Sequence, residues 1–147
     1  MVSQITFQNS YDKKGTNMIR ALLLSSIFAL TLTSCMDIDD EILPVVGVYR
    51  AHVVGVSGPF DLVVSTDRGD DILIDSKLDG YEWYVAKADI DNQDKSVMDI
   101  DIFDQNIAPG TFIKGEGFFR DNTIELRYSI DFGNGEIVNF KLVATKI

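Results

Sequence analysis

Apolar and polar residues alternate along most of the chain between residues 44 and 147. In the clearest run, from Ile124 to Phe132, every even-numbered residue is apolar and every odd-numbered residue is polar. Successive side chains of a β-strand point to opposite faces, so this period of two predicts a strand with one buried and one solvated face. No apolar stripe with helical spacing and comparable length occurs in this part of the sequence.

Eight runs of this kind occur, at residues 45–54, 60–66, 71–76, 81–89, 96–103, 111–120, 123–132 and 136–146. Turn sequences separate them, such as Ser57-Gly58-Pro59, Asp91-Asn92-Gln93-Asp94 and Ala108-Pro109-Gly110. Short connections favour consecutive antiparallel hairpins, and closure of the sheet removes its exposed edges. We therefore predict an all-β domain that forms an antiparallel, eight-stranded, up-and-down barrel.

Parts of this domain resemble the small lipocalin-like, or calycin-like, lipoproteins. The resemblance lies in Val46-Gly47-Val48-Tyr49, Gly115-Glu116-Gly117-Phe118-Phe119, the run from Ile124 to Tyr128, and a closing strand through Phe140 and Leu142. It implies a lipocalin-like barrel that binds a small ligand or a protein. Tyr49 stands where true lipocalins have the tryptophan of Gly-x-Trp. Gly115 and Gly117 fall on one face, where missing side chains permit a strand to coil sharply.

The run from Ala21 to Leu32 has twelve residues without a charge and follows basic residues at positions 13, 14 and 20. This pattern is typical of a secretory signal. A twelve-residue helix is about 18 Å long, well short of the roughly 30 Å hydrocarbon core of a membrane. We therefore predict a signal segment over residues 1–34. Met18-Ile19-Arg20 is itself a complete short basic start, which makes Met18 an alternative first residue.

The uncharged run ends in Leu32-Thr33-Ser34-Cys35, which resembles the lipobox of bacterial lipoproteins. The resemblance implies cleavage between Ser34 and Cys35, lipidation of the Cys35 sulfur, acylation of the new N-terminus, and an outer-membrane lipid anchor. Several acyl chains make such an anchor stable, because each buried methylene contributes about 0.8 kcal/mol. The alternative is that Cys35 is only a small residue at the end of an ordinary signal or of a buried helix.

Residues 35–43 are predicted to be an acidic linker to a barrel domain over residues 44–147. The stretch from Met36 to Glu41 contains four acidic residues in six positions. It resembles the signals with which some anaerobic Gram-negative gut bacteria send lipoproteins to the cell surface. A solvated spacer between membrane and barrel is an equally good interpretation.

The chain has 13 basic and 23 acidic residues, a formal net charge of −10. Without residues 1–34, it has 10 basic and 22 acidic residues, a net charge of −12. This acidity argues against nucleic acid as a partner. The single cysteine permits no internal disulfide and no thiolate zinc cluster, and the single histidine removes the common multi-histidine metal sites. We predict no cofactor and no resident metal.

Carboxylates cluster at Asp89, Asp91 and Asp94, at positions one, three and six of a calcium-type loop. An EF-hand loop needs a glycine at position six and a glutamate at position twelve, and neither is present. Asp99 and Asp101 have two interpretations. They converge with Asp89 from adjacent strands to bind calcium, or they form a solvated acidic face.

Aromatic residues supply the candidate contacts. Tyr81 and Trp83 share one strand face by alternation and Tyr84 takes the other. We predict that Trp83 is a core residue, and the alternative is an external contact for a sugar or a protein. Tyr81, Trp83 and Tyr128 are therefore the candidate ligand-binding residues. His52 is predicted to be a surface or rim residue, because no nucleophile motif accompanies it.

These features predict a membrane-anchored, non-enzymatic envelope lipoprotein whose barrel binds a small apolar ligand, a glycan or a cationic protein. A sharper form is an inhibitor of a basic, lysozyme-like enzyme, because a strongly acidic domain attracts cationic partners. A structural envelope component is a further alternative. A hydrolase is the least favoured class, because no spacing of carboxylates or nucleophiles singles out a catalytic pair.

Overall fold

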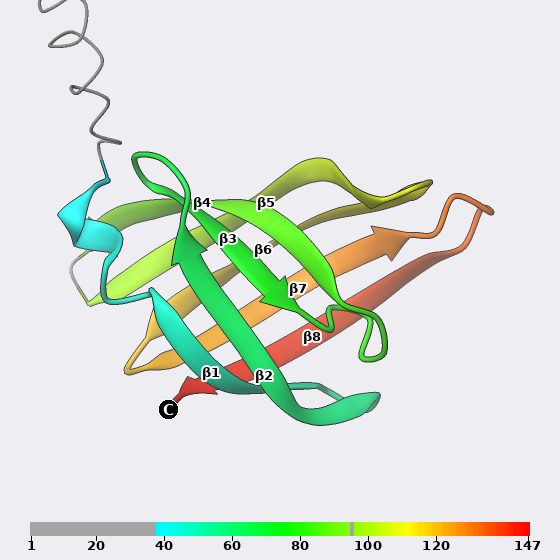
Figure 1. Cartoon of the computed structure of the whole chain (residues 1–147), viewed down its shortest axis with the longest axis horizontal. Helices are drawn as coiled ribbons and strands as arrows, with labels where there is room; N and C mark the ends of the chain where they lie inside the picture. The colour runs from blue at the N-terminus through cyan, green and yellow to red at the C-terminus, as the bar shows by residue number, and fades with distance from the viewer. Residues whose placement is uncertain (1–37, 95) are drawn as a thin grey trace, which may run out of the picture. The chain divides into compact units, whose positions relative to one another are not determined.

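The computed structural model describes residues 38–94 and 96–147, and Figure 1 shows its strands wrapped into a barrel. A short 3-10 helix, η1 (Asp40–Ile42), precedes the strands. The strands are β1 (Gly47–Val53), β2 (Ser57–Thr66), β3 (Asp71–Ser76), β4 (Tyr84–Asp94), β5 (Val97–Ala108), β6 (Thr111–Arg120), β7 (Thr123–Asp131) and β8 (Ile137–Lys146).

Every strand pairs antiparallel with its neighbour in the sequence, and β1 pairs with β8 to close the barrel. The prediction of an all-β, eight-stranded, up-and-down barrel is confirmed. This is also the architecture that the lipocalin-like resemblance implies. The closing ladder runs from Tyr49 opposite Lys146 to Val53 opposite Leu142.

Two predicted turns are parts of strands. Ser57-Gly58-Pro59 belongs to β2, because the hairpin turns earlier, where the Val56 amide donates to the Val53 carbonyl at 3.0 Å. Asp91-Asn92-Gln93-Asp94 belongs to β4, which pairs with β5 as far as Asp94 opposite Val97. In both places a strand contains residue types that are common in turns, and composition alone does not distinguish the two positions.

The start of β4 and the end of β5 also differ from the prediction. β4 begins at Tyr84 instead of residue 81, because the Asp79 carboxylate accepts the Tyr81 and Glu82 amides at 2.7 and 2.8 Å and holds those residues in a turn. β5 continues past Phe103, where the sequence pattern ends, through a bulge that shifts its register against β6 between Ile102 and Gln105.

The barrel interior is a single apolar core. Its buried residues alternate along the strands as predicted, for example Ile124, Leu126, Tyr128 and Ile130 of β7. Both ends are filled by side chains from outside the strands: Ile42 and Val45 at the η1 end, and Leu78 from the β3–β4 loop at the other. Ile42, which lies within the predicted linker, therefore contributes to the core.

Gly115 and Gly117 allow β6 and β7 to approach closely. A Cβ atom on Gly115 would lie 2.3 Å from the Tyr128 Cβ atom, and one on Gly117 would lie 2.2 Å from the Glu125 carbonyl oxygen. Real Cβ atoms do not approach other atoms so closely. The absent side chains therefore permit the local coiling of this hairpin.

Candidate functional site on the outer wall

Tyr128, a predicted ligand-binding residue, is part of the filled interior. Its side chain is 4% exposed, its ring stacks on Phe140 with centroids 5.8 Å apart, and its hydroxyl donates to the Leu78 carbonyl. Burial raises the pKa of this hydroxyl. Two hollows, of about 840 and 540 Å³, are lined mainly by residues of the outer face. The candidate site is therefore external.

Tyr81 and Trp83 lie outside the core, which corrects the prediction that Trp83 is buried. They are 67% and 53% exposed, because both precede β4 in the β3–β4 loop. Asp79, which is 8% exposed, fixes this loop by accepting the Tyr81 and Glu82 amides. Its carboxylate also accepts a hydrogen bond of 3.2 Å from the Tyr84 hydroxyl. Two aromatic side chains are thus presented to solvent on a hydrogen-bonded loop.

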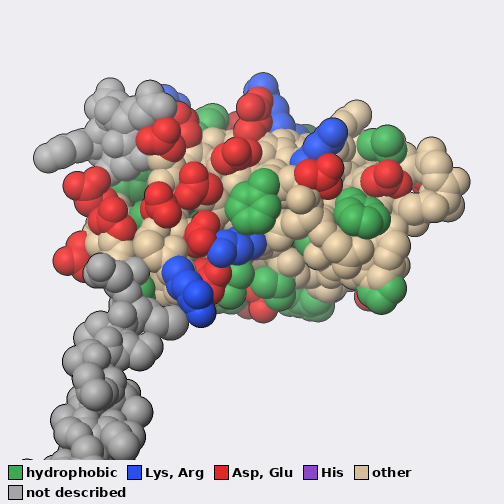
Figure 2. All heavy atoms as spheres, turned by 90° about the horizontal axis from the view of Figure 1, so that it is seen from above, with side chains coloured by type: hydrophobic (Ala, Val, Ile, Leu, Met, Phe, Trp, Pro, Cys, Tyr) green, Lys and Arg blue, Asp and Glu red, His purple; other side chains and the backbone are tan. Residues whose placement is uncertain are grey.

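Four carboxylates line up across the outer face of four neighbouring strands. Asp71 of β3 lies opposite Asp89 of β4, Asp89 opposite Asp101 of β5, and Asp101 opposite Glu116 of β6. We call this set the acidic row. Figure 2 shows acidic side chains gathered most densely toward the end of the barrel that carries η1. On the next two strands the same line carries positive charge: Arg127 of β7 lies opposite Glu116, and Lys141 of β8 lies opposite Arg127.

The predicted convergence of Asp89 with Asp101 is present, whereas Asp99 lies opposite Asp91. The Asp70, Asp71 and Asp89 carboxylates lie within 4.8 Å of one another. Burial raises the pKa of the Asp89 carboxyl, and the charges of its acidic neighbours raise it further. Three carboxylates at this spacing could hold a cation, but Asp71 already forms an ion pair of 2.6 Å with Lys87.

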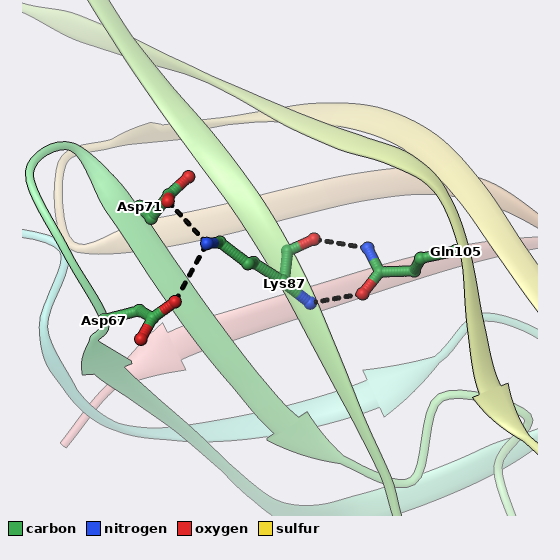
Figure 3. A network of polar contacts seen from close by, with 4 residues as sticks. All are labelled: Asp67, Asp71, Lys87 and Gln105. Carbon is green, nitrogen blue, oxygen red and sulfur yellow. Dashed lines mark hydrogen bonds and ion pairs between the residues drawn. The ribbon is translucent and has the colours of Figure 1, made fainter.

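Lys87 of β4 contacts the β2–β3 turn, β3 and β5 (Figure 3). Its ammonium contacts the Asp67 and Asp71 carboxylates at 2.9 and 2.6 Å, and these contacts raise the pKa of Lys87. Its peptide N–H donates to the Gln105 side-chain oxygen at 2.8 Å, and the Gln105 amide nitrogen donates to the Lys87 carbonyl at 2.6 Å. Gln105 thus binds β4 as a strand's peptide group would.

The hollow of about 840 Å³ is shallow and crosses the outer faces of β5 to β8. A second, of about 540 Å³, adjoins it and shares Asp101, Glu116 and Arg127. No ion pair joins Asp101 or Glu116 to any other described residue. Exposed Phe103 adds an aromatic ring to the larger hollow. Such a mixture of free carboxylates, cations and an aromatic ring suits a polar macromolecular surface.

The remaining predicted residues are also placed. His52 is exposed on β1, as predicted, with its side chain against Gly58. Leu32, Thr33, Ser34 and Cys35, on which the lipobox depends, lie outside the described residues. Within residues 38–94 and 96–147, none of the helices has the length and apolar character needed to cross a membrane.

Sequence reasoning missed Asp79 and Gln105. Asp79 precedes a glycine in a turn, a general signal for side-chain hydrogen bonding to the backbone. Gln105 carried no such signal, because its role depends on where the residue-by-residue pairing of β4 with β5 ends, at Asp89 opposite Asp101.

Comparison with protein-family models, with curated proteins and with solved structures found no match.

Proposed function

We propose that this protein is a non-enzymatic envelope lipoprotein, anchored in the outer membrane through Cys35, whose outer barrel wall binds a cationic protein. The filled interior is the observation that favours a protein over a small apolar ligand, because Tyr128 and Leu78 occupy the space that a lipocalin-like ligand would need.

The acidic row supports attraction of a positively charged partner. Its field extends about 8 Å at physiological salt and mainly accelerates encounter. Affinity needs buried apolar contact as well, because exposed charges chiefly set association rates. Phe103, Tyr81 and Trp83 supply exposed aromatic surface for that contact.

A binding assay with lysozyme, used as a cationic protein probe, tests the partner class. We expect residues 38–147 to retain lysozyme at about 0.15 M salt and to release most of it at about 0.5 M salt, because added ions screen exposed charges. The double variant Asp101→Asn/Glu116→Gln should weaken retention at the lower salt. Asp121→Asn/Glu136→Gln is the matched control, since it removes the same charge from two turns. Equal retention by both double variants would exclude the acidic row as the binding surface.

Inhibition of a basic, lysozyme-like enzyme is the second candidate, favoured by the same charge. It predicts that retained lysozyme loses activity on cell-wall substrate in proportion to the bound fraction. Full activity of the bound enzyme would reject inhibition and leave binding intact.

The anchor is tested separately with Cys35→Ala in the full chain. We expect this variant to lose acyl-lipid labelling and to leave the membrane fraction. Its circular dichroism spectrum should match that of the unmodified chain, because the barrel does not depend on Cys35. Undiminished labelling would show that Cys35 is not the lipidated residue.

A further inference from the structure

The hollow of about 840 Å³ lies over two neighbouring rows of outward-facing side chains. One row is the line of charges from Asp101 of β5 to Lys141 of β8. In the other, Lys114 of β6 lies opposite Ser129 of β7, and Ser129 lies opposite Asn139 of β8. Serine and asparagine are shorter than lysine and arginine, so they leave the wall low between longer side chains. Neighbouring strands lie about 4.8 Å apart, so four strands give a floor about 14 Å across.

A bulge in β5 adds an aromatic ring to one side of the hollow. The register of β5 against β6 shifts between Ile102 and Gln105. The two residues within this shift, Phe103 and Asp104, are both exposed, whereas strict alternation would turn one of them inward. The Phe103 side chain is 41% exposed and lines the hollow beside polar side chains.

The charges around the hollow cancel, although the chain from residue 35 onward carries a net charge of −12. Three carboxylates and three cations line it: Asp101, Asp104, Glu116, Lys114, Arg127 and Lys141. Lys141 pairs with Glu125 at 2.9 Å, whereas the other five form no ion pair with any described residue. A cationic segment would gain little here, because the three cations oppose the attraction of the three carboxylates.

The polar groups of the hollow match the hydroxyl groups of a sugar. A hydroxyl group both donates and accepts hydrogen bonds. Around the hollow the carboxylates accept, the ammonium and guanidinium groups donate, and the Asn139 amide does both. Hydrogen bonds to ionised groups are stronger than those between neutral groups. A neutral ligand rich in hydroxyl groups would therefore use both kinds of charge.

Phe103 supplies the apolar contact that such a ligand needs. The face of an aromatic ring is negative and attracts the polarised C–H groups on one face of a sugar ring. An uncharged peptide would instead need apolar pockets for several side chains. Phe103 and Val54 are the exposed large apolar side chains that line the hollow. This lining favours a polyhydroxyl ligand over a peptide.

We propose that the hollow over β5 to β8 binds a neutral oligosaccharide. One sugar ring lies against Phe103, and hydroxyl groups bond to Arg127, Asn139 and the neighbouring carboxylates. The floor is longer than a single sugar ring, so the ligand has several units. This ligand is additional to the cationic protein of the proposed function, and the inference does not depend on that function.

Isothermal titration calorimetry of the full chain, in a detergent without a sugar headgroup, tests this inference. The probes are neutral hexasaccharides of glucose, mannose, xylose and N-acetylglucosamine. We expect at least one of them to bind with a Kd of about 1 mM or lower. This Kd should change less than threefold between about 0.15 and 0.5 M salt, because the ligand has no charge to screen. Absence of binding by all four, or a tenfold loss of affinity at the higher salt, would overturn the inference.

Variants of two phenylalanines locate the site. Phe103→Ala should reduce the affinity at least tenfold, whereas Phe103→Tyr keeps the ring and should change it less than threefold. Phe112→Ala is the matched control, since Phe112 is 43% exposed on β6 and does not line this hollow. Equal affinities of Phe103→Ala and Phe112→Ala would overturn the inference.

Amide chemical shifts of the unmodified chain give an answer even if a variant does not fold. The bound hexasaccharide should shift the signals of Lys114, Ser129 and Asn139 and leave those of Tyr81 and Trp83 in place. Shifts centred on Tyr81 and Trp83 would assign the sugar to the β3–β4 loop and overturn the inference. Retention of lysozyme without any sugar binding would refute this inference alone and leave the proposed function intact.

Discussion

Leu126 and Arg127 are adjacent in β7 and occupy opposite environments. Leu126 is fully buried and packs at Gly117, whereas Arg127 points to solvent. We expect Leu126→Ala to reduce the free energy of unfolding by about 2–5 kcal/mol, because it leaves a cavity in the core. Arg127→Ala should change it by about 0.5 kcal/mol or less. Urea denaturation of both variants measures this, and similar losses would contradict the alternation of faces.

Asp89 is predicted to destabilise the barrel when it is ionised. Burial and acidic neighbours raise the pKa of its carboxyl in the folded state, so the folded state holds this proton more tightly than the unfolded state. Tighter proton binding by Asp89 stabilises the folded state. This stabilisation is complete below the unfolded-state pKa of about 3.9 and is lost as pH rises through the folded-state pKa.

Asp89→Asn should consequently stabilise the barrel at pH 7, by up to about 1 kcal/mol, because like charges opposite one another are unfavourable. Below about pH 3.5 the gain should disappear, since Asp89 is then protonated in both states. Thermal denaturation across this pH range provides the measurement, with Asp121→Asn as an exposed control. Destabilisation by Asp89→Asn at pH 7 would show that the carboxylate has a favourable partner.

Gln105 connects two strands where their ladder has ended. Replacement by leucine leaves the Lys87 N–H and C=O without these bonds, so we expect Gln105→Leu to cost about 1–3 kcal/mol. The adjacent Asn106 is exposed, and Asn106→Leu is the matched control. Chemical denaturation compares the two variants. Equal stability would mean that water replaces the Gln105 amide without loss.

The strands were predictable where local pattern alone decides them. The bounds of β3 and β6 match the predicted runs, because turn sequences such as Pro109-Gly110 and Asp121-Asn122 mark their ends. The start of β4 was not predictable from alternation, since the Asp79 carboxylate holds Tyr81 and Glu82 out of the strand. For the same reason Trp83, predicted as core, is exposed.

The closed interior predicts how the whole molecule responds to apolar probes. We expect the neutral dye N-phenyl-1-naphthylamine to show no saturable fluorescence increase with the barrel, because Leu78 and Ile42 fill its two ends. Leu78→Ala should lower the free energy of unfolding by about 2–5 kcal/mol, whereas exposed Leu43→Ala should have little effect. Saturable dye binding by the unmodified barrel would restore the small-ligand hypothesis.

The candidate site was less predictable than the barrel. Acidity, and the adjacency of Asp89 and Asp101, followed from composition and strand order. The filled interior did not, because it depends on Leu78 of a loop and Ile42 of a presumed linker entering the two ends. The register shift of β5 against β6 was also hidden, since it does not follow from any residue type.

If Cys35 is lipidated as proposed, the entry of Ile42 and Val45 into one end of the barrel has a consequence for the distance between the barrel and the bilayer. Ile38, which bridges to Gly69 in the β2–β3 turn, follows Cys35 by three residues. Three residues span at most about 11 Å. A lipid on Cys35 would therefore keep this end near the headgroups, leaving little vertical travel. The opposite end, where the β3–β4 loop presents exposed Tyr81 and Trp83, would remain open to molecules arriving from the aqueous side.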